Sequence, residues 1–351
     1  MHITPRGFGP DGEFGGGERF PFELAHAMSD RVEVRLVTFG SRSYAYSKGN
    51  LKVCIERPLL HVRGHPNEPL NIGFLRHIVW SDVVHCHQFR STVCPISAIV
   101  AKLTGASSYV TDHGGGGLDL LRRMRLGKII DARMVQSVFA DKTMGSIGKE
   151  SIPIYGGVDI NRFYPCKPKI AGQFVFLGRI LPHKGIEHLI RGLPYGSKLS
   201  VIGRTIDADY LTFLKQEAVE KDVSFVHDAN DFQVVESLSS AEAVILPSVH
   251  HDYVGRHQRF PELLGLVLLE AMSCGTAIVC SNVGGMPEVV NEGVTGFVVR
   301  PGSHTDIRSV LNKFLSQGSL GKDMGAAARN DVLRRFTWES VAMHCLEQYQ
   351  G

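Results

Sequence analysis

The segment Pro261–Val290 reads PELLGLVLLEAMSCGTAIVCSNVGGMPEVV and carries two glutamates, Glu262 and Glu270, in an apolar run. If one helix ran through both, eight steps of about 100° would place them within roughly 80° of each other, about 12 Å apart along the axis. That suits contact with two ends of one elongated ligand. It does not suit a glycosidase pair, whose carboxylates lie about 5–5.5 Å apart in retaining and about 6.5–9.5 Å apart in inverting enzymes. The amides of Gly265 and Leu266 would open the helix and could bind phosphate. The alternative is a capped core helix with two incidental glutamates.

Short apolar runs alternate with amphipathic stretches on the N-terminal side of this segment and beyond it. We predict strands at 32–38, 82–87 and 108–111, with helices at 20–28 and 91–103, and then strands at 174–177, 199–202, 223–226, 243–246, 276–280 and 296–299. This order favours an α/β fold with parallel sheets that helices cover on both faces.

The length of 351 residues fits two domains of about 150 residues each. Helix- and strand-breaking residues lie between the two halves, at Pro165, Pro168 and Gly172. We therefore predict an N-terminal domain over 1–165 and a C-terminal domain over 166–335. A last helix would follow over 336–351. Open α/β sheets bind ligands at the carboxyl ends of their strands, and two such sheets facing each other would form a cleft.

The composition excludes several classes of protein. A formal net charge of +3, with 38 basic against 35 acidic residues, argues against a dedicated nucleic-acid binder. We expect no membrane span, because no apolar run reaches about 18 residues, and no signal peptide. The seven cysteines form no C-x-x-C pair and are odd in number, so we expect reduced thiols in a cytoplasmic protein.

Two cations stand in one loop of the predicted C-terminal domain. The run LGRILPHKGIE follows a strand, and it places Arg179 and Lys184 just before a helix that we expect to start near Lys184. Arginine can grip diphosphate oxygens bidentately and lysine adds a point charge, so the pair could stabilise a departing diphosphate. The alternative is a solvated loop with two ordinary surface cations.

Two features of the N-terminal half suit an anion or a sugar. Gly16 and Gly17 precede a predicted helix, where glycine permits close backbone approach and the helix N-terminus favours anions. The alternative is a flexible turn, since neither a dinucleotide fingerprint nor a P-loop lysine is present. His113 follows a strand, so it could donate a hydrogen bond to a sugar hydroxyl or an anion, or it could be a structural histidine.

Two further patterns carry weaker signals. His85 and His87 point to one face of a strand, which suggests a metal site, but a third ligand is missing and Cys86 faces the other way. We therefore expect no metal. The segment 121–128 has four basic residues among apolar ones. It could touch an anionic acceptor or a membrane surface, although a solvated helix face is favoured.

Together and in this order, these motifs resemble those of one family. They are similar to motifs of the retaining GT-B glycosyltransferases of the family 4 group, the glycosyl transferases group 1. The matching stretches are the E-x(7)-E block with its following GGMPE, the R-x(4)-K block in FLGRILPHKGIEHLI, the segment GGVDINRFYP and the tail FTWESVA. The resemblance runs essentially end to end. It implies two Rossmann-like, doubly wound domains that face a central cleft, with the last helix crossing back to the first domain.

The resemblance also implies roles for the residues singled out above. Arg179 and Lys184 would hold the donor diphosphate, Glu270 the ribose hydroxyls of the nucleotide, and Glu262 the transferred sugar. The amides of Gly265 and Leu266 would support the phosphates. No divalent metal or other cofactor would be needed, because the two cations replace it.

The remaining donor contacts are implied in the same way. Gly16 and Gly17 would approach the donor from the opposite domain, and His113 would contact the sugar ring. The base would lie near 225–228, which includes His227. The chain departs from the family pattern at Gly156, where Asn is common, and at Leu264, where Phe is common. The stretch between Gly117 and Ala132, where the acceptor usually docks, is short.

The leading expectation is therefore a metal-independent enzyme that moves a hexose-type sugar from a nucleotide-diphosphate sugar to an unknown acceptor hydroxyl on a glycan, lipid or secondary metabolite. The alternatives are a GT-B phosphorylase and a non-catalytic nucleotide-sugar binding protein. A Rossmann dehydrogenase is disfavoured, because its fingerprint is missing. The expected location is the cytoplasm, with peripheral contact at the inner membrane face as an alternative.

Overall fold

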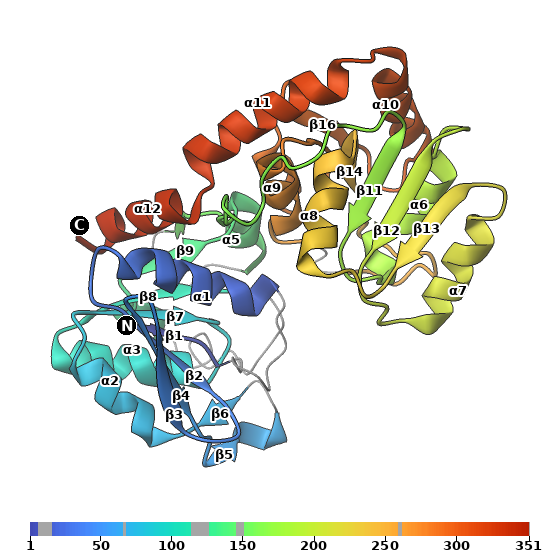
Figure 1. Ribbon diagram of the computed structural model, residues 1–351. Coiled ribbons are helices and arrows are strands. Elements are labelled where there is room, and N and C mark those ends of the chain that lie inside the picture. The colour runs from blue at the N-terminus through green and yellow to red at the C-terminus, as the bar shows by residue number, and fades with distance from the viewer. Residues whose placement is uncertain (6–15, 66–67, 114–125, 145–150, 259–261, 351) are drawn as a thin grey trace. The chain divides into compact units, whose positions relative to one another are not determined.

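The computed structural model describes residues 1–5, 16–65, 68–113, 126–144, 151–258 and 262–350. The chain folds into two compact units (Figure 1). The N-terminal unit comprises Met1–Gly157 and Trp338–Gly351, and the C-terminal unit comprises Val158–Thr337. The division falls at Gly157 rather than at the predicted residue 165, because the backbone N–H of Val158 donates to Phe336 at 2.9 Å and Phe163 is buried in the C-terminal unit.

The N-terminal unit is built on an eight-stranded sheet of order β10-β9-β8-β7-β1-β2-β4-β3. Neighbouring strands run parallel except β3, which is antiparallel to β4. The strands are β1 (His2–Ile3), β2 (Arg35–Phe39), β3 (Tyr44–Lys48), β4 (Leu51–Glu56), β7 (Val83–His87), β8 (Ser107–Thr111), β9 (Ala132–Val135) and β10 (Ser151–Pro153). A two-stranded sheet of β5 (Leu60–His61) and β6 (Pro69–Leu70) accompanies it.

Helices cover both faces of this sheet, and strand alternation sorts its side chains between them. Val37 joins a core with α2 (Leu75–Val79) and α3 (Val93–Thr104). Its neighbour Leu36 joins a second core with α1 (Gly16–Ser29) and α12 (Trp338–Gln350). The last helix therefore packs in the N-terminal unit, as the resemblance implied. A further helix, α5 (Val138–Met144), follows β9.

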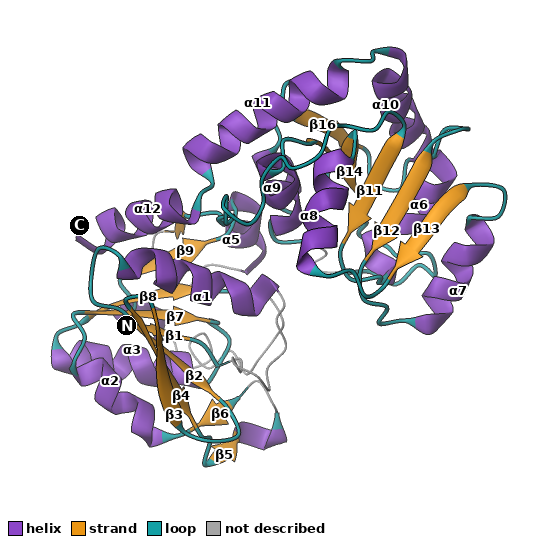
Figure 2. Ribbon diagram, viewed as in Figure 1, coloured by secondary structure: helices purple, strands orange, loops and turns teal. Residues whose placement is uncertain are grey.

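The C-terminal unit holds a six-stranded, all-parallel sheet of order β13-β12-β11-β14-β15-β16 (Figure 2). The strands are β11 (Gln173–Leu177), β12 (Lys198–Ile202), β13 (Asp222–Val226), β14 (Ala243–Leu246), β15 (Ala277–Ser281) and β16 (Gly296–Val299). The strand order reverses between β11 and β14. In open parallel sheets, ligands bind at such a reversal, beyond the carboxyl ends of the strands.

The helices of the C-terminal unit form two packed groups. One group contains α6 (Ile186–Gly192), α7 (Ala208–Glu217) and α10 (His304–Ser316). The other contains α8 (Asp231–Ser240), α9 (Leu266–Ser273) and α11 (Leu320–Arg335). The α/β fold with helix-covered parallel sheets, predicted from the apolar pattern, is thus confirmed, as are the doubly wound domains that the resemblance implied.

Two smaller expectations can be compared with the described residues. None of the seven cysteines forms a disulfide. Within the described ranges, no helix is both long enough and apolar enough to cross a bilayer.

Candidate functional site

The carboxyl edge of the C-terminal sheet begins with two glycines that bring neighbouring loops together. Gly203 follows β12 with φ +150°, and a Cβ on it would lie 1.9 Å from the carbonyl oxygen of Gly178. Beyond these glycines the loops stay side by side, because Ile180 N–H donates to the carbonyl of Arg204 at 3.0 Å. Arg179 is thereby held at the end of β11, exposed to solvent and next to the strand-order reversal.

Lys184 ends a short 3-10 helix, Pro182–Lys184, that Gly185 closes in a left-handed conformation with φ 64°. A Cβ on Gly185 would lie 2.4 Å from the carbonyl oxygen of Pro247, so only glycine fits. The Lys184 ammonium forms an ion pair with the carboxylate of Glu262. Only 13% and 18% of these two side chains are exposed. Each charge is therefore compensated by the other within the site.

The ring of His183 lies beside this ion pair. Burial, together with the neighbouring Lys184 charge, lowers the pKa of His183 to about 4. The imidazole is therefore neutral near pH 7. Lys184 supplies the fixed positive charge in this part of the loop.

Glu262 lies outside the helix that carries Glu270, so the expectation of one helix through both glutamates is wrong. Helix α9 begins at Leu266, and Gly265 is its N-cap in a left-handed conformation with φ 85°. A Cβ on Gly284 would lie 1.8 Å from the carbonyl oxygen of Glu262, so a glycine turn holds the Glu262 backbone away from the helix axis. The angle and rise calculated for a continuous helix do not apply to this pair.

The start of α9 still has the properties expected from Gly265 and Leu266. The N–H groups of a first helical turn lack intrahelical partners, and the helix dipole favours an anion there. Glu270 follows on α9 with 7% of its surface exposed. The helix thus presents its N-terminus at the same edge as Glu262 and holds a buried carboxylate one to two turns further on.

His227 directly follows β13 and is exposed. Its Nδ1 lies 3.2 Å from the carbonyl oxygen of Gly203 and 3.1 Å from Thr205 Oγ1. These contacts hold the His227 ring against the loop that follows β12. The predicted C-terminal residues Arg179, Lys184, His227, Glu262, Gly265 and Leu266 thus follow the carboxyl ends of β11, β13 and β14.

The predicted residues of the N-terminal unit lie at the ends of its own elements. Gly16 and Gly17 are the first residues of α1, and His113 lies two residues after β8. Their approach to a donor stays a prediction. Most of the basic segment 121–128 and all of the stretch from Gly114 to Gly117 lie outside the described residues.

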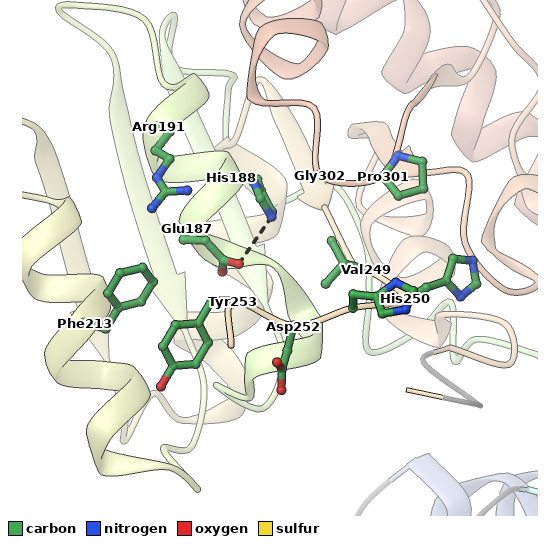
Figure 3. Close-up of a pocket in the computed structure, with 11 residues that line it drawn as sticks. Glu187, His188, Arg191, Phe213, Val249, His250, Asp252, Tyr253, Pro301 and Gly302 are labelled. Atoms are coloured by element: carbon green, nitrogen blue, oxygen red, sulfur yellow. Dashed lines mark ion pairs between the residues drawn. The ribbon is translucent and has the colours of Figure 1, made fainter. Parts of the chain in front are cut away.

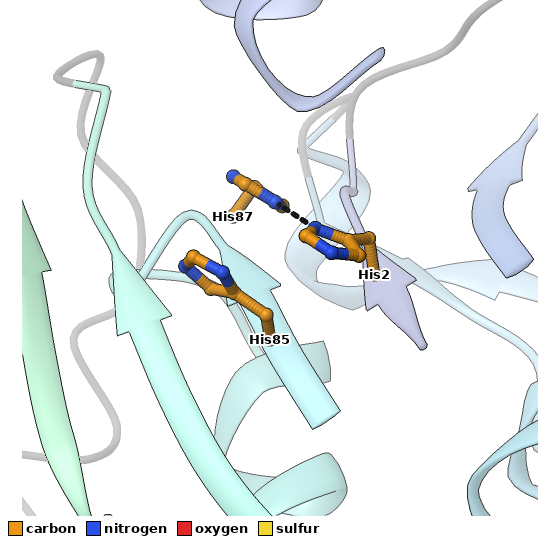
Figure 4. Close-up of side chains that lie close together, drawn as sticks. All are labelled: His2, His85 and His87. Atoms are coloured by element: carbon orange, nitrogen blue, oxygen red, sulfur yellow. Dashed lines mark hydrogen bonds between the residues drawn. The ribbon is translucent and has the colours of Figure 1, made fainter. Parts of the chain in front are cut away.

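His113 Nε2 lies 3.1 Å from His87, a member of a histidine cluster that the sequence only partly indicated. Figure 4 shows the three cluster members His2, His85 and His87. His85 and His87 share one face of β7, as predicted, while Cys86 lies in the core on the other face. The third histidine is His2 of β1, which pairs in register with His85. Ligand nitrogens of these three buried rings lie within 4.8 Å of one another. The expectation that no third histidine joins them is therefore wrong, because strand pairing across the sheet brings His2 in from a distant part of the chain.

The ring nitrogens of the cluster have hydrogen-bond partners within the protein. His85 meets the Tyr349 hydroxyl at 2.6 Å through Nδ1 and the Thr111 hydroxyl at 2.7 Å through Nε2. The rings of His85 and His87 stack at 4.3 Å with 22° between their planes. Stacked rings do not direct their nitrogens at a common centre. The expected lack of a metal stays a prediction.

Burial keeps these rings uncharged. It lowers the pKa of His85 to about 3 and holds the pKa values of His2 and His87 well below the ordinary value of 6.5, with further lowering from neighbouring histidines. A protonated ring here would lose its hydration and repel its neighbours. The cluster is therefore neutral near pH 7.

A pocket of about 600 Å³ lies on the C-terminal unit, beside α6 and α7 (Figure 3). Its acids are held by protein groups, since Tyr210 donates to Glu187 at 2.5 Å and Arg256 donates to Asp252 at 3.0 Å. None of the predicted donor residues lines this pocket. It adjoins the Lys184 loop, because the N–H of Val249, one of its lining residues, donates to the carbonyl of His183 at 2.9 Å.

Comparison with known proteins identifies the domain that carries this edge. The family model described as glycosyl transferases group 1 matches residues 160–331, which include Arg179, Lys184, Glu262 and Glu270. Residues 160–331 are thus a glycosyl transferases group 1 domain.

Relatives and solved structures agree with that assignment. An uncharacterized glycosyltransferase of Methanocaldococcus jannaschii is 31% identical over 184 residues, covering 51% of this chain and 44% of that protein. The alpha-maltose-1-phosphate synthase of Mycobacterium tuberculosis is 28% identical over 226 residues, covering 56% of each chain. The chain thus spans about half the length of these curated relatives.

The structural likeness extends over both units. The crystal structure of Anabaena HepE in complex with UDP covers 99% of this chain and 98% of that chain, with a TM-score of 0.76 and 17% identity. A sucrose-phosphate synthase from Thermosynechococcus elongatus has a TM-score of 0.72 at 19% identity. These similarities show the two-domain GT-B fold of this chain.

Proposed function

We propose that this chain is an enzyme that transfers a hexose-type sugar from a nucleotide-diphosphate sugar to an acceptor hydroxyl, with retention of anomeric configuration and without a metal. The observation that carries the proposal is the grouping of Arg179, Lys184, Glu262 and the start of α9 beyond the strands that flank the order reversal. Cations and a helix N-terminus at such an edge suit a diphosphate.

In the proposed reaction, Arg179, Lys184 and the amides of Gly265 and Leu266 bind the diphosphate. The Lys184 charge, now paired with Glu262, would stabilise the leaving phosphate as its negative charge develops. Positioned cations can do this work in place of a divalent ion. The acceptor oxygen forms the new glycosidic bond while the bond from the sugar to the phosphate oxygen breaks; the hydroxyl proton passes to the departing phosphate, and the nucleoside diphosphate leaves.

We assign the nucleotide to Glu270 and His227. The Glu270 carboxylate would accept hydrogen bonds from the ribose hydroxyls. His227 lies exposed directly after β13, so its ring could contact the base. UDP is the first nucleotide to test, because the HepE crystal structure of the same fold contains UDP. The acceptor class and a cytoplasmic location stay predictions.

A thermal-shift and calorimetric screen of UDP, GDP, ADP and their glucose or mannose conjugates tests this function. Ligand at about 100 times its dissociation constant should stabilise the fold by about 2.7 kcal/mol. We expect one nucleotide class to bind and its sugar conjugate to release nucleotide when acceptor glycans are added. Binding without turnover would favour a non-catalytic binding protein. Formation of sugar 1-phosphate from a glycoside and inorganic phosphate, without nucleotide, would favour a phosphorylase.

A further inference from the structure

His113 is one member of a row of hydrogen-bonded side chains that crosses the N-terminal unit. Gln136 Nε2 lies 2.5 Å from His113 Nδ1, and His113 Nε2 lies 3.1 Å from His87 Nδ1. His87 Nε2 then lies 2.9 Å from His2 Nδ1, and His2 Nε2 lies 3.2 Å from the Met28 sulfur. Each ring in this row uses both of its nitrogens.

The two ends of the row determine its direction. A thioether sulfur only accepts, so the proton at the Met28 end is on His2 Nε2. His2 Nδ1 must then accept from His87 Nε2–H, and His87 Nδ1 must accept from His113 Nε2–H. That leaves His113 Nδ1 as an acceptor, which matches the donating amide nitrogen of Gln136 at the other end. One arrangement of protons therefore satisfies every member.

Packing holds the row in place. The ring planes of His2 and His87 differ by 19°, and those of His87 and His113 by 17°. His85 stacks on the His87 face, and the Phe20 ring lies 4.8 Å from His113. The row is also buried at His2, His87 and Gln136, with 3%, 1% and 7% exposed. His113, the half-buried ring, is thus the point where this row reaches the surface.

We propose that His87 and Gln136 are positioning residues that hold His113 as the neutral Nε2–H tautomer in a fixed ring orientation for the donor sugar. This proposal rests on the proposed function for the role of His113, but the tautomer itself does not. Because Gln136 and His87 pair with both nitrogens, the row holds the His113 ring in one orientation before a donor sugar binds.

The test uses the full chain with ¹⁵N-labelled histidine, and His113→Asn assigns the His113 signals. We expect wild-type His113 at pH 7 to show a protonated Nε2 and a bare Nδ1. Gln136→Glu places an acceptor at Nδ1, so we expect a proton on both nitrogens of His113 at pH 7. Gln136→Leu should keep the Nε2–H tautomer. A charged or Nδ1–H ring in the wild type, or an unchanged ring in Gln136→Glu, would overturn the proposal.

A second readout separates positioning from general damage. If UDP-glucose is the donor identified above, Gln136→Leu should raise its KM about tenfold while the Kd of UDP stays within twofold, and His87→Gln, which can donate and accept, should restore more of the KM than His87→Ala. The control His61→Gln changes an exposed ring of the same unit. Equal losses of UDP and UDP-glucose binding in Gln136→Leu would contradict positioning. Failure of the wild type to bind any nucleotide would instead defeat the proposed function, and the ring signals would still test the row.

Discussion

The polar side chains of the two sheets of this chain have opposite kinds of chemistry. The C-terminal edge carries permanent charges in loops, where Lys184 pairs with Glu262 and Arg179 faces solvent. The N-terminal sheet carries His2, His85 and His87, which are buried and uncharged; His87 ends β7, and His2 and His85 pair with each other within their strands. A charge near solvent can exchange one partner for another at modest cost, whereas a buried neutral group needs a fixed partner. The charged loops of the C-terminal sheet are suited to bind an anion, and the buried histidines of the N-terminal sheet are suited to hold a side chain in one orientation.

The largest expected effect tests the charged edge. Lys184→Ala should lower nucleotide release from the bound nucleotide-sugar about 10²–10³-fold, because one positioned charge on the leaving phosphate is lost. Circular dichroism should show an intact fold, since Glu262 can reach water. The matched control is Lys167→Ala, which removes the lysine of another Lys–Glu pair in the same unit. A normal rate in Lys184→Ala would end the assignment of the diphosphate to this edge.

Lowering the pH should destabilise the N-terminal unit, because its buried histidines His2, His85 and His87 are neutral in the folded state. Both tryptophans, Trp80 and Trp338, lie in the N-terminal unit, so their fluorescence reports its unfolding. The folded pKa values of the buried rings lie below the unfolded value of about 6.5, so the unfolded state binds more protons as the pH falls. The stability that the rings confer is complete above about pH 6.5. It should fall by about 1.4 kcal/mol per pH unit for each ring below that.

Urea titrations at pH 7.0, 6.0 and 5.5 measure this slope. His85→Gln should flatten it by about 1.4 kcal/mol per pH unit, because one proton fewer is taken up on unfolding. The exposed-ring control His61→Gln should leave the slope unchanged. A wild-type stability that is independent of pH over this range would mean that the rings are not held neutral.

Removal of the His87 ring tests how much the buried histidines stabilise the N-terminal unit. His87→Ala should lower the free energy of unfolding of the N-terminal unit by about 3 kcal/mol at pH 7, because it leaves a cavity and two buried nitrogens without partners. Tryptophan fluorescence in urea measures the loss, with His61→Ala as the matched control. A loss below about 1 kcal/mol would show that the row contributes little to the stability of the N-terminal unit.

A smaller effect of opposite sign is expected at the ion pair. Glu262→Gln removes the carboxylate that now neutralises Lys184, so free UDP should bind about two- to fivefold more tightly. Isothermal calorimetry compares this variant with Glu236→Gln, which opens the Lys167 pair of the same unit. Weaker UDP binding in Glu262→Gln would mean that Glu262 orders the loop rather than competes with the phosphate.

No change is expected when divalent ions are removed. Because Arg179 and Lys184 supply the positive charge at the charged edge, the initial rate in excess EDTA should stay within about twofold of the untreated rate. Abolition of activity by EDTA, with recovery on addition of Mg²⁺ or Mn²⁺, would replace the metal-free mechanism by a metal-assisted one.

Local pattern predicted the strands of the C-terminal unit well, because apolar periodicity reflects burial directly, but it missed β3, β4, β9 and β10 of the N-terminal unit. Strands 243–246 and 296–299 have the bounds expected, and α12 joins the N-terminal unit as the tail motif implied. The continuous helix through Glu262 was wrong, because the apolar pattern does not record the backbone contact with Gly284. His2 and Gln136 were missed for a related reason, since each lies far along the chain from the ring it contacts.

The sequence by itself determined the α/β class, the family of the C-terminal domain and the loop that carries Arg179 and Lys184, because these depend on local periodicity and on short, ordered motifs. Only the tertiary structure decided that Lys184 meets Glu262, that Glu262 stands outside α9, and that His2, His87, His113 and Gln136 form one row. Those contacts depend on strand order and register. Strand order and register bring together segments separated by 20 or more residues, and a short stretch of sequence does not show which distant residues it will contact.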